Sequence, residues 1–220
     1  MTKTRQQLGA WYSSKEFILK AIERLPITKN TTFLDPSCGH GYFFDVIHSV
    51  YPDIPLENFH GIDIDPQAVK KCKEKYINIK CEDALFSKWV DTDIVLGNPP
   101  FLGRYKFLSV LGCEYRDKIM NEFYDIRGNN DLAVYFLRKA HQHSSKYASF
   151  ITPNIIKSSS DCRRNTWEYV LNNGGKIYNV HTNLKWDGDA NVFVDIVTWA
   201  KDGLLHKQQE SKYNQLKLEY

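Results

Sequence analysis

The string Asn98-Pro99-Pro100-Phe101 carries the strongest chemical signal in the sequence. The amino group of a nucleobase is a poor nucleophile, because its lone pair is delocalised into the ring. Two acceptors aimed at its protons, the Asn98 side-chain oxygen and the Pro99 carbonyl oxygen, would localise that lone pair toward a methyl donor. The prolines fix the backbone direction, and Phe101 offers a ring on which a base can stack. An ordinary proline turn would explain the prolines, but neither the asparagine before them nor the aromatic residue after them.

A second string places an acid at the end of a predicted strand and a glycine-rich loop after it. This string is Asp35-Pro36-Ser37-Cys38-Gly39-His40-Gly41. The glycines let the backbone pass close to a ligand. A dinucleotide fingerprint would need glycine or alanine where this chain has Phe44. Asp35 would also repel a pyrophosphate at the start of the following helix. The acid suits a cationic ligand instead, and the amino group and sulfonium of S-adenosylmethionine fit this sign.

Further acids follow the next two predicted strands. Asp63 ends the run Phe59–Asp63, where a carboxylate can accept the hydroxyl protons of a ribose. Asp65 is expected to cap the following helix. Asp83 follows a weak strand at Tyr76–Lys80, and its carboxylate could accept a hydrogen bond from the adenine amino group of the cofactor. Asp63 has the alternative role of a second helix cap, and an acid in a loop such as Asp83 is by itself uninformative.

Basic residues gather in two segments after the catalytic string. They are Arg104, Lys106, Arg116, Lys118 and Arg127, followed by Arg163 and Arg164. If both segments lie at the carboxyl ends of the strands, together they could neutralise several phosphates beside a flipped base. Any single one of these residues could equally be an ordinary solvated charge. The net charge of +3 permits nucleic-acid binding but does not argue for it.

These strings must be positioned by a fold, and apolar runs alternate with helical patterns throughout the chain. The predicted strands are Thr32–Asp35, Phe59–Asp63, Tyr76–Lys80, Thr92–Leu96, Ala148–Thr152, Ile177–His181 and Val192–Trp199. The predicted helices are Tyr42–Val50, Pro66–Lys73, one capped by Asp131, and Arg163–Leu171, with loop and helix at Leu102–Asn129. This alternation predicts a doubly wound α/β sheet. We expect one domain over residues 1–203 and a polar tail over residues 204–220.

The composition argues against several classes of protein. No run approaches the roughly 20 apolar residues of a membrane span, and Met1–Gln7 is polar, unlike a signal peptide. We therefore expect a soluble, cytoplasmic protein without a membrane partner. The five cysteines have no CxxC spacing, which argues against a disulfide framework and a zinc site. His141 and His143 are expected to be solvated rather than metal ligands, so no metal is predicted.

The order of these motifs resembles that of the gamma class of DNA adenine-N6 methyltransferases. Leu8–Ser13 resembles the N-terminal motif of that class, which lines the methionine end of the cofactor site. Over roughly residues 8–202, the chain is similar to the methyltransferase region of the MmeI group of fused restriction–modification enzymes. The strings that carry this likeness are Asn98-Pro99-Pro100-Phe101-Leu102-Gly103, Asp131-Leu132-Ala133-Val134-Tyr135-Phe136 and Trp186-Asp187-Gly188-Asp189-Ala190-Asn191-Val192.

The resemblance implies a Rossmann-like class I methyltransferase fold, with a mostly parallel, doubly wound sheet, a C-terminal antiparallel strand and S-adenosyl-L-methionine as cofactor. The expected catalytic residues are Asn98, Pro99, Pro100 and Phe101. The expected cofactor-binding residues are Trp11, Tyr12, Asp35, Pro36, Cys38, Gly39, Gly41, Asp63, Ile64, Asp83 and Asn98. The residues expected to face the target base or the nucleic acid are Phe101, Trp186, Arg163 and Arg164. Trp186 has the alternative role of a buried tryptophan at a strand edge.

The resemblance also implies a nucleic-acid partner, with DNA ahead of RNA. Gamma-class enzymes carry a target-recognition domain after the last catalytic strand, and the fused enzymes carry an endonuclease region before the catalytic part. We expect neither here, because about 20 residues follow Trp199 and the first motif begins close to Met1. A separate recognition subunit would then supply specificity. The alternatives are the same chemistry on adenine in rRNA or tRNA, or on glutamine in a protein, and a non-catalytic methyltransferase-like subunit that binds a partner.

Overall fold

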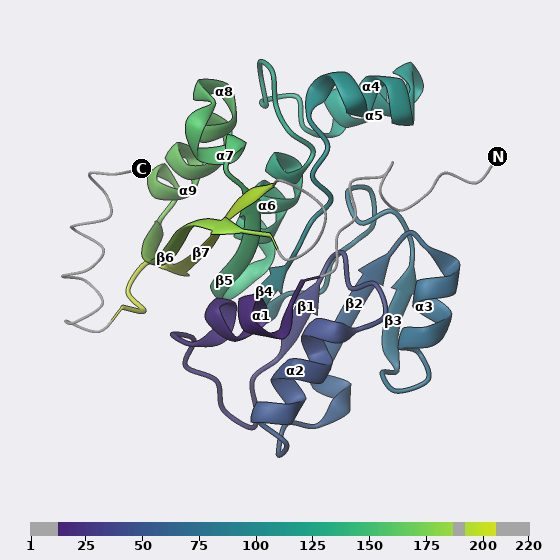
Figure 1. Cartoon of the computed structure of the whole chain (residues 1–220), viewed down its shortest axis with the longest axis vertical. Helices are drawn as coiled ribbons and strands as arrows, with labels where there is room; N and C mark the ends of the chain where they lie inside the picture. Colours follow the sequence, from purple (N-terminus) through teal and green to yellow (C-terminus); the bar gives the residue numbers. More distant parts are fainter. Residues whose placement is uncertain (1–12, 187–191, 206–220) are drawn as a thin grey trace.

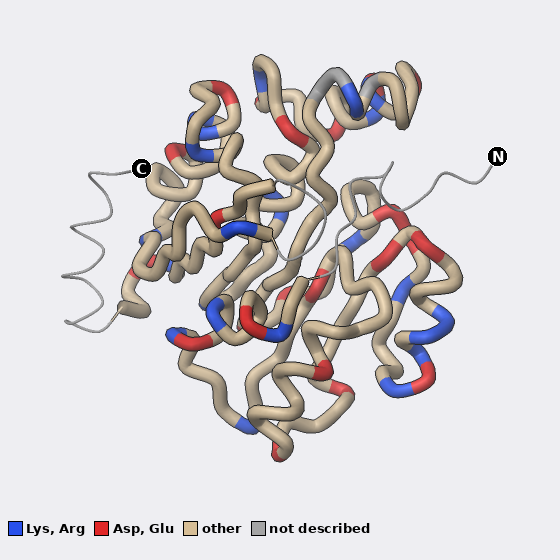
Figure 2. Tube along the Cα trace, viewed as in Figure 1, with Lys and Arg blue, Asp and Glu red and all other residues tan. Residues whose placement is uncertain are grey.

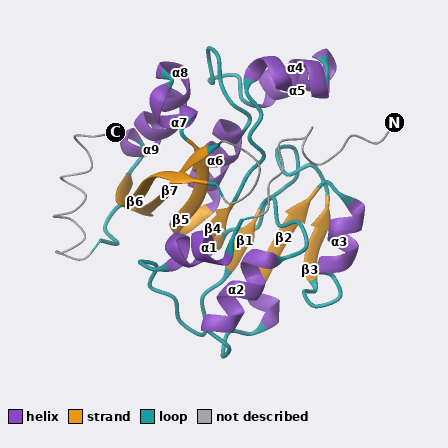
Figure 3. Cartoon of the chain, in the orientation of Figure 1, coloured by secondary structure: helices purple, strands orange, loops and turns teal. Residues whose placement is uncertain are grey.

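A seven-stranded sheet crosses the centre of the protein, and helices cover both of its faces (Figures 1 and 3). This computed structural model describes residues 13–186 and 192–205. The strands are β1 (Phe33–Asp35), β2 (Phe59–Asp63), β3 (Asn78–Cys81), β4 (Thr92–Gly97), β5 (Ser144–Pro153), β6 (Gly175–Lys185) and β7 (Phe193–Lys201). They lie in the order β3-β2-β1-β4-β5-β7-β6, and β7 runs antiparallel to both of its neighbours. The predicted doubly wound sheet with a C-terminal antiparallel strand is confirmed.

The helices form two layers with separate apolar cores. One face of the sheet carries α1 (Lys15–Ile22), α2 (Tyr42–Val50) and α3 (Pro66–Cys72), whose buried residues pack in one cluster. The other face carries α6 (Ala133–His143), which packs with Trp167 and Val170 in a second cluster. The remaining helical segments are α4 (Arg104–Leu111), α5 (Cys113–Glu122), α7 (Ile155–Ser158), α8 (Ser160–Arg163), a π-helical turn (Arg164–Glu168) and α9 (Tyr169–Asn172).

Local sequence signals explain where the first helices begin. Asp65 caps α3, because its side chain accepts hydrogen bonds from the backbone nitrogens of Gln67 (2.9 Å) and Ala68 (3.3 Å), as predicted. Gly41 precedes α2 with a φ of 88°. A Cβ atom at Gly41 would lie 2.8 Å from the Cys72 sulfur, so only glycine fits this close approach of α2 to α3. The glycine of the predicted loop is therefore required by packing as well as by backbone conformation.

Helix α1 was not predicted from the sequence. Ser14 caps it by accepting a hydrogen bond from the Phe17 nitrogen (3.4 Å). Its apolar face is buried, with Phe17, Ile18, Ala21 and Ile22 at helical spacing. The last turn is fixed to the sheet by the buried hydroxyl of Ser149, which donates to the Ala21 carbonyl oxygen at 2.7 Å. This spacing and the preceding serine were the signals available in the sequence.

Other boundaries differ from the predictions. The helical region expected at Arg163–Leu171 extends from Ser160 to Asn172 and includes the π-helical turn. Leu102–Asn129, expected to be loop and helix, contains the two helices α4 and α5. The predicted boundary between domain and tail at residue 203 stays a prediction, since most of residues 204–220 lies outside the described residues.

The solvated state predicted for His141 is wrong, because this side chain is buried in α6 at 2% exposure. The Trp199 indole nitrogen donates to His141 Nδ1 at 3.2 Å, and His141 Nε2 lies 3.1 Å from the Asn173 carbonyl oxygen. Burial lowers the pKa of His141 to about 4. His143 lies at the surface, 2.9 Å from Asp91. Within the described residues, no three metal-ligating side chains cluster, and no helix has the length and apolarity to cross a membrane.

Candidate active site

Four predicted site residues lie at the carboxyl ends of four adjacent strands. Asp35 ends β1 and Asp63 ends β2, while Asp83 follows β3 and Asn98 follows β4 directly. These strands are parallel neighbours in the order β3-β2-β1-β4, so their ends share one edge of the sheet. Figure 2 shows acidic residues gathered where β2 and β3 end. The strands therefore bring together the groups that the sequence separates by up to 63 positions.

Asp35 is almost fully buried and joins the glycine loop to the predicted catalytic string, Asn98-Pro99-Pro100-Phe101. Its side chain is 1% exposed, and its Oδ1 accepts a hydrogen bond from the Ser37 nitrogen at 2.9 Å. The Ser37 hydroxyl oxygen lies 3.3 Å from the same carboxylate oxygen and 3.1 Å from the Asn98 carbonyl oxygen. Burial raises the pKa of Asp35 to about 7, against the opposing effect of the Ser37 backbone hydrogen bond. The bridging hydroxyl of Ser37 was missed in the sequence, because it depends on a contact between distant positions.

Asp63 holds the glycine loop from the neighbouring strand. The Gly39 nitrogen donates to Asp63 Oδ2 at 2.7 Å, and the Asp65 nitrogen donates to Asp63 Oδ1 at 2.9 Å. The Cys38 nitrogen donates to the Ile62 carbonyl oxygen at 3.1 Å, so the loop is fixed to β2 at two points. Asp63 therefore has a structural role in the loop, beside the contact with a ribose that stays a prediction.

Asp83 lies in a tight turn that is covered by α5. Its Oδ1 accepts a hydrogen bond from the Leu85 nitrogen at 3.0 Å. Burial, together with the charge of Asp83 and a hydrogen bond to it, raises the pKa of Tyr115 on α5. The Tyr115 ring packs on Phe86 at 5.4 Å between centroids, and the Lys118 ammonium lies 3.8 Å from the centre of the Phe86 ring. This contact between α5 and the Asp83 turn was not predicted.

The catalytic string is held at both of its ends. Before it, a Cβ atom at Gly97 would lie 2.6 Å from Asp35 Oδ1, so the backbone that leads into Asn98 runs directly against the buried carboxylate. After it, the Leu102 nitrogen donates to Asp131 Oδ1 at 3.3 Å, and the Leu102 carbonyl oxygen accepts from the Leu132 nitrogen at 3.0 Å. Asp131 Oδ1 also accepts from the Ala133 nitrogen at 2.9 Å, so the predicted capping side chain contacts the first residue of α6 from two positions before it, while Leu132 holds the N-cap position.

Phe101 and Trp186 lie together beside this string. Their ring centroids are 6.2 Å apart with an interplanar angle of 80°, and Trp186 also meets Phe17 of α1 at 5.5 Å. Trp186 is 5% exposed, and Phe101 is partly buried against the same cluster. The packing of Trp186 thus matches the alternative role of a buried tryptophan, while its position next to Phe101 is the one that a base-stacking role requires. Contact of either ring with a base stays a prediction.

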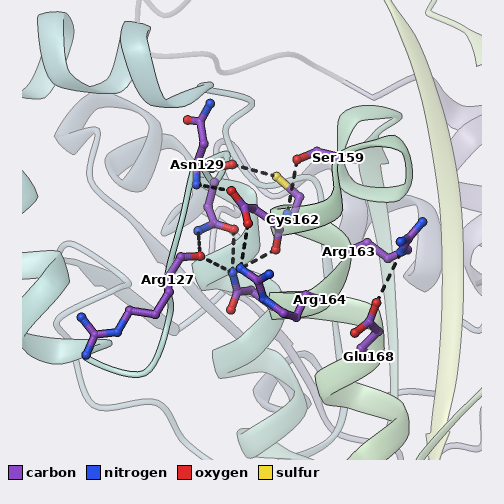
Figure 4. Close-up of polar contacts among 10 residues, drawn as sticks. Arg127, Asn129, Ser159, Cys162, Arg163, Arg164 and Glu168 are labelled. Carbon is purple, nitrogen blue, oxygen red and sulfur yellow. Dashed lines mark hydrogen bonds and ion pairs between the residues drawn. The ribbon is translucent and has the colours of Figure 1, made fainter.

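The two predicted phosphate ligands each pair with an acid close by in the chain. Arg163 Nε lies 3.4 Å from Glu168 Oε1, and an Arg164 guanidinium nitrogen lies 2.7 Å from Asp161 Oδ1 (Figure 4). Their side chains are 42% and 52% exposed. Figure 1 places α8 on the same side of the sheet as α4 and α5. The sequence did not indicate that these cations would have carboxylate partners.

The loop before α6 fixes the helix that carries these arginines. The Asn165 side-chain nitrogen donates to the Arg127 carbonyl oxygen at 2.7 Å, and the Asn129 nitrogen donates to Asp161 Oδ2 at 2.7 Å. Figure 4 shows the Arg127 side chain pointing away from this cluster. The same loop leads into Asp131, so α8 is connected to the end of the predicted catalytic string through hydrogen bonds between side chains and backbone. The expected cofactor contacts of Trp11 and Tyr12 lie outside the described residues.

Comparison with known proteins identifies a family and a fold. Residues 74–185, half of the chain, match the Eco57I restriction-modification methylase family. Modification methylase CviBIII of Paramecium bursaria Chlorella virus NC1A is 28% identical over 171 residues, which cover 73% of this chain and 42% of that protein. The chain thus spans less than half the length of this relative.

Two solved structures have the same fold at low sequence identity. A Listeria monocytogenes protein assigned to the class I S-adenosylmethionine-dependent methyltransferases superposes with a TM-score of 0.65 at 18% identity, covering 88% of this chain and 59% of that one. The M protein of the type I restriction enzyme EcoKI superposes with a TM-score of 0.62 at 14% identity, covering 87% of this chain and 44% of that one. The fold is therefore that of the class I methyltransferases, as predicted.

Proposed function

Because the chain belongs to the Eco57I restriction-modification methylase family, we propose that it transfers a methyl group from S-adenosylmethionine to the N6 amino group of adenine in DNA. The observation that carries the proposal is the bridge at Ser37. Its hydroxyl lies within hydrogen-bond distance of both the buried Asp35 carboxylate and the carbonyl oxygen of Asn98. Because the Ser37 nitrogen already donates to Asp35, the single hydroxyl proton can go to the Asn98 carbonyl oxygen, and Ser37 then links the groups for the cofactor to the groups for the target amine.

The residues at the strand ends fit the chemistry of S-adenosylmethionine. Its cationic amino group and sulfonium would lie near Asp35 and the Gly39–Gly41 loop, its ribose near Asp63 and Ile64, and its adenine near Asp83. Acceptors predominate at the ends of β1, β2 and β3, and the backbone turns tightly at Gly39 and Gly41. When bound, the cofactor supplies an electrophilic methyl group on a positively charged sulfur.

The predicted catalytic string would act on the target amine by accepting hydrogen bonds from its two N–H groups. Asn98 Oδ1 and the Pro99 carbonyl oxygen would bind the two amino hydrogens and orient the lone pair toward the methyl group. The amine becomes acidic once it is methylated, so a strong general base is not needed, and alignment supplies most of the rate. Phe101, which is only partly buried, would offer aromatic surface for a flipped base, and the buried Trp186 ring supports it edge to face.

DNA specificity would come from a second subunit or from further chain. One similar protein is named a modification methylase and another is the M protein of a type I restriction enzyme. Three of the predicted basic residues pair with acids: Arg116 with Asp117, besides the two pairs of Arg163 and Arg164. Contacts to phosphate from such residues are sequence-independent and salt-sensitive. Alone, the chain should bind duplexes weakly and with little selectivity.

The test is methyl transfer by the purified chain from labelled S-adenosylmethionine to DNA, RNA and protein in separate reactions. DNA should take up label, and digestion to nucleosides should give N6-methyladenine by mass spectrometry. Asn98→Ala serves as the matched catalytic control. Label in RNA adenine or in protein glutamine would show that RNA or protein, rather than DNA, is the substrate. Label in cytosine would refute adenine as the target base. Binding of cofactor without transfer to any of the three would favour a non-catalytic subunit.

A further inference from the structure

Lys139 is buried, and its ammonium group contacts backbone carbonyl oxygens of the turn after β3 instead of a carboxylate. Its residue is 8% exposed in the middle of α6. The Lys139 ammonium donates to the carbonyl oxygens of Ala84 (3.0 Å), Leu85 (3.0 Å) and Ser87 (2.6 Å). An ammonium group has three N–H donors, so these carbonyls use all of them. Burial lowers the pKa of Lys139 to about 8, although the charges of Glu122 and Asp83 act in the opposite direction.

The three carbonyls belong to the turn that begins at Asp83. The nitrogens of Phe86 and Ser87 donate to the Asp83 carbonyl oxygen at 3.1 Å and 2.9 Å, and the Leu85 nitrogen donates to the Asp83 side chain. The turn is thus wound around Asp83, with its own carbonyls directed toward α6. The Ala84 carbonyl oxygen also accepts from the Trp89 indole nitrogen at 2.7 Å. An apolar side chain at position 139 would therefore remove the Lys139 donor chiefly from the Leu85 and Ser87 carbonyl oxygens, and buried carbonyls without a donor are costly.

Helix α6 also holds the catalytic string, through Asp131 and Leu132 at its start. The helix therefore makes fixed polar contacts with two parts of the site at once. Asp131 sets the position of Leu102 after the string, and Lys139, two turns further along, sets the turn that carries Asp83. A displacement of the turn relative to the string would separate the adenine end of the cofactor from its methyl end.

We propose that Lys139 is a positioning residue for cofactor recognition: through the turn of residues 83–87, it places the Asp83 carboxylate to accept a hydrogen bond from the adenine amino group. This inference rests on the proposed use of S-adenosylmethionine. Because its three donors are directed at the turn, Lys139 would act through Asp83, and its effect should appear in the selectivity for adenine rather than in the chemical step.

The chain offers a matched control in Lys201, at the end of β7. The Lys201 ammonium also donates to a backbone carbonyl oxygen, that of His141, and burial lowers its pKa as well. Lys201 lies in β7 opposite Gly175, at the start of β6, and therefore at the sheet edge opposite the site. Lys201→Met removes a comparable lysine without touching the turn at Asp83.

The experiment measures binding of S-adenosylhomocysteine and of its inosine analogue, which has a carbonyl in place of the adenine amino group, by calorimetry. Wild-type protein should prefer the adenine ligand by about tenfold, the effect of one hydrogen bond to a charged acceptor. Lys139→Met should bind the adenine ligand about tenfold more weakly and lose most of this preference. Lys201→Met should keep both values within about twofold, and turnover of Lys139→Met at saturating cofactor should fall less than threefold.

Several outcomes would overturn the inference. An unchanged adenine-to-inosine ratio in Lys139→Met would do so, even with weaker binding, because general loosening affects both ligands alike. If that variant does not fold, Lys139→Arg carries the test, since its guanidinium keeps donors at the turn and should restore the wild-type ratio to within threefold. A folded Lys139→Arg protein without the preference would contradict the role. Wild-type protein that binds neither ligand would refute the proposed cofactor itself, which distinguishes the two failures.

Discussion

Gly97→Ala tests whether the backbone before Asn98 must lie against the buried carboxylate of Asp35. The added Cβ atom would be 2.6 Å from Asp35 Oδ1 and 3.2 Å from its Cγ. An ordinary contact begins at 3.4 Å, so either the carboxylate or the catalytic string must move by about 0.8 Å. Asp35 has little freedom to yield, because it is 1% exposed and accepts a hydrogen bond from the Ser37 nitrogen.

The expected cost follows from that displacement. Overpacking of this kind destabilises a fold by about 1–3 kcal/mol. A misplacement of about 1 Å between reacting groups costs on the order of 10²-fold in rate. We therefore expect kcat for methyl transfer to fall about 10²-fold in Gly97→Ala, with an unfolding free energy about 1–3 kcal/mol below that of the wild type. Steady-state methylation and urea unfolding measure the two quantities.

Gly103→Ala is the matched control, five positions beyond Asn98 in the same segment. A Cβ atom there would lie 3.9 Å from Asp131 Oδ2, an ordinary contact, so both rate and stability should stay close to those of the wild type. A folded Gly97→Ala protein with wild-type kcat would refute the reasoning, because it would mean that the string can shift without loss. An equal loss in both variants would show that the segment tolerates no side chain at all, for reasons unrelated to Asp35.

Four further results are expected. Asp63→Ala should weaken S-adenosylmethionine binding by about 1.5–3 kcal/mol in calorimetry, because it removes the ribose acceptor and frees the Gly39 nitrogen. Unchanged affinity would refute the assignment of Asp63 to the ribose. Asn98→Ala should lower turnover by about 10²-fold or more at nearly constant cofactor affinity, whereas near-normal turnover would show that Asn98 only shapes the turn. Since burial raises the pKa of Asp35 to about 7, the folded state binds more protons than the unfolded state between about pH 4 and 7. Wild-type stability should therefore fall as the pH rises through this window, and an identical pH slope in Asp35→Asn would contradict this. The double variant Arg163→Ala/Arg164→Ala should bind duplexes more weakly, with a salt slope smaller by about 2; a wild-type slope would show that these arginines do not meet phosphates.

The fold was predictable wherever one segment contained its own signal. The strand before Asp35, the strand before Asp63 and the helix capped by Asp65 all appear close to their predicted bounds, since apolar runs, acids and prolines mark these boundaries locally. Helix α1 has a comparable signal in the Ser14 cap and in the helical spacing of its buried residues. The burial of His141 had none, because it depends on Trp199, a partner 58 positions away that only the folded sheet supplies.

Within the candidate site, the residues with a local sequence signal were also the ones that could be predicted. The residues expected to touch the ligands, such as Asp35 and Asn98, sit at the sheet edge where the strand-end rule puts them. The residues that hold them in place could not be predicted from the sequence. Ser37 and Lys139 act through contacts with backbone carbonyl oxygens far along the chain. A serine or a lysine in a sequence is compatible with so many environments that its type predicts no partner, whereas an acid at the end of a buried strand is restricted by the cost of burying its charge.

The ion pairs of Arg163 and Arg164 bear on how this fold could hold DNA. Each cation already has a carboxylate within 4 Å, which at first argues against a phosphate site. Both arginine side chains are about half exposed, however, and exposed pairs contribute only about 0–1 kcal/mol, so a phosphate can replace the carboxylate at little cost. The acids that remain would then repel any phosphate backbone that is not correctly placed. Under the proposed function, these paired arginines would therefore favour nucleic acid that a separate recognition subunit has already positioned.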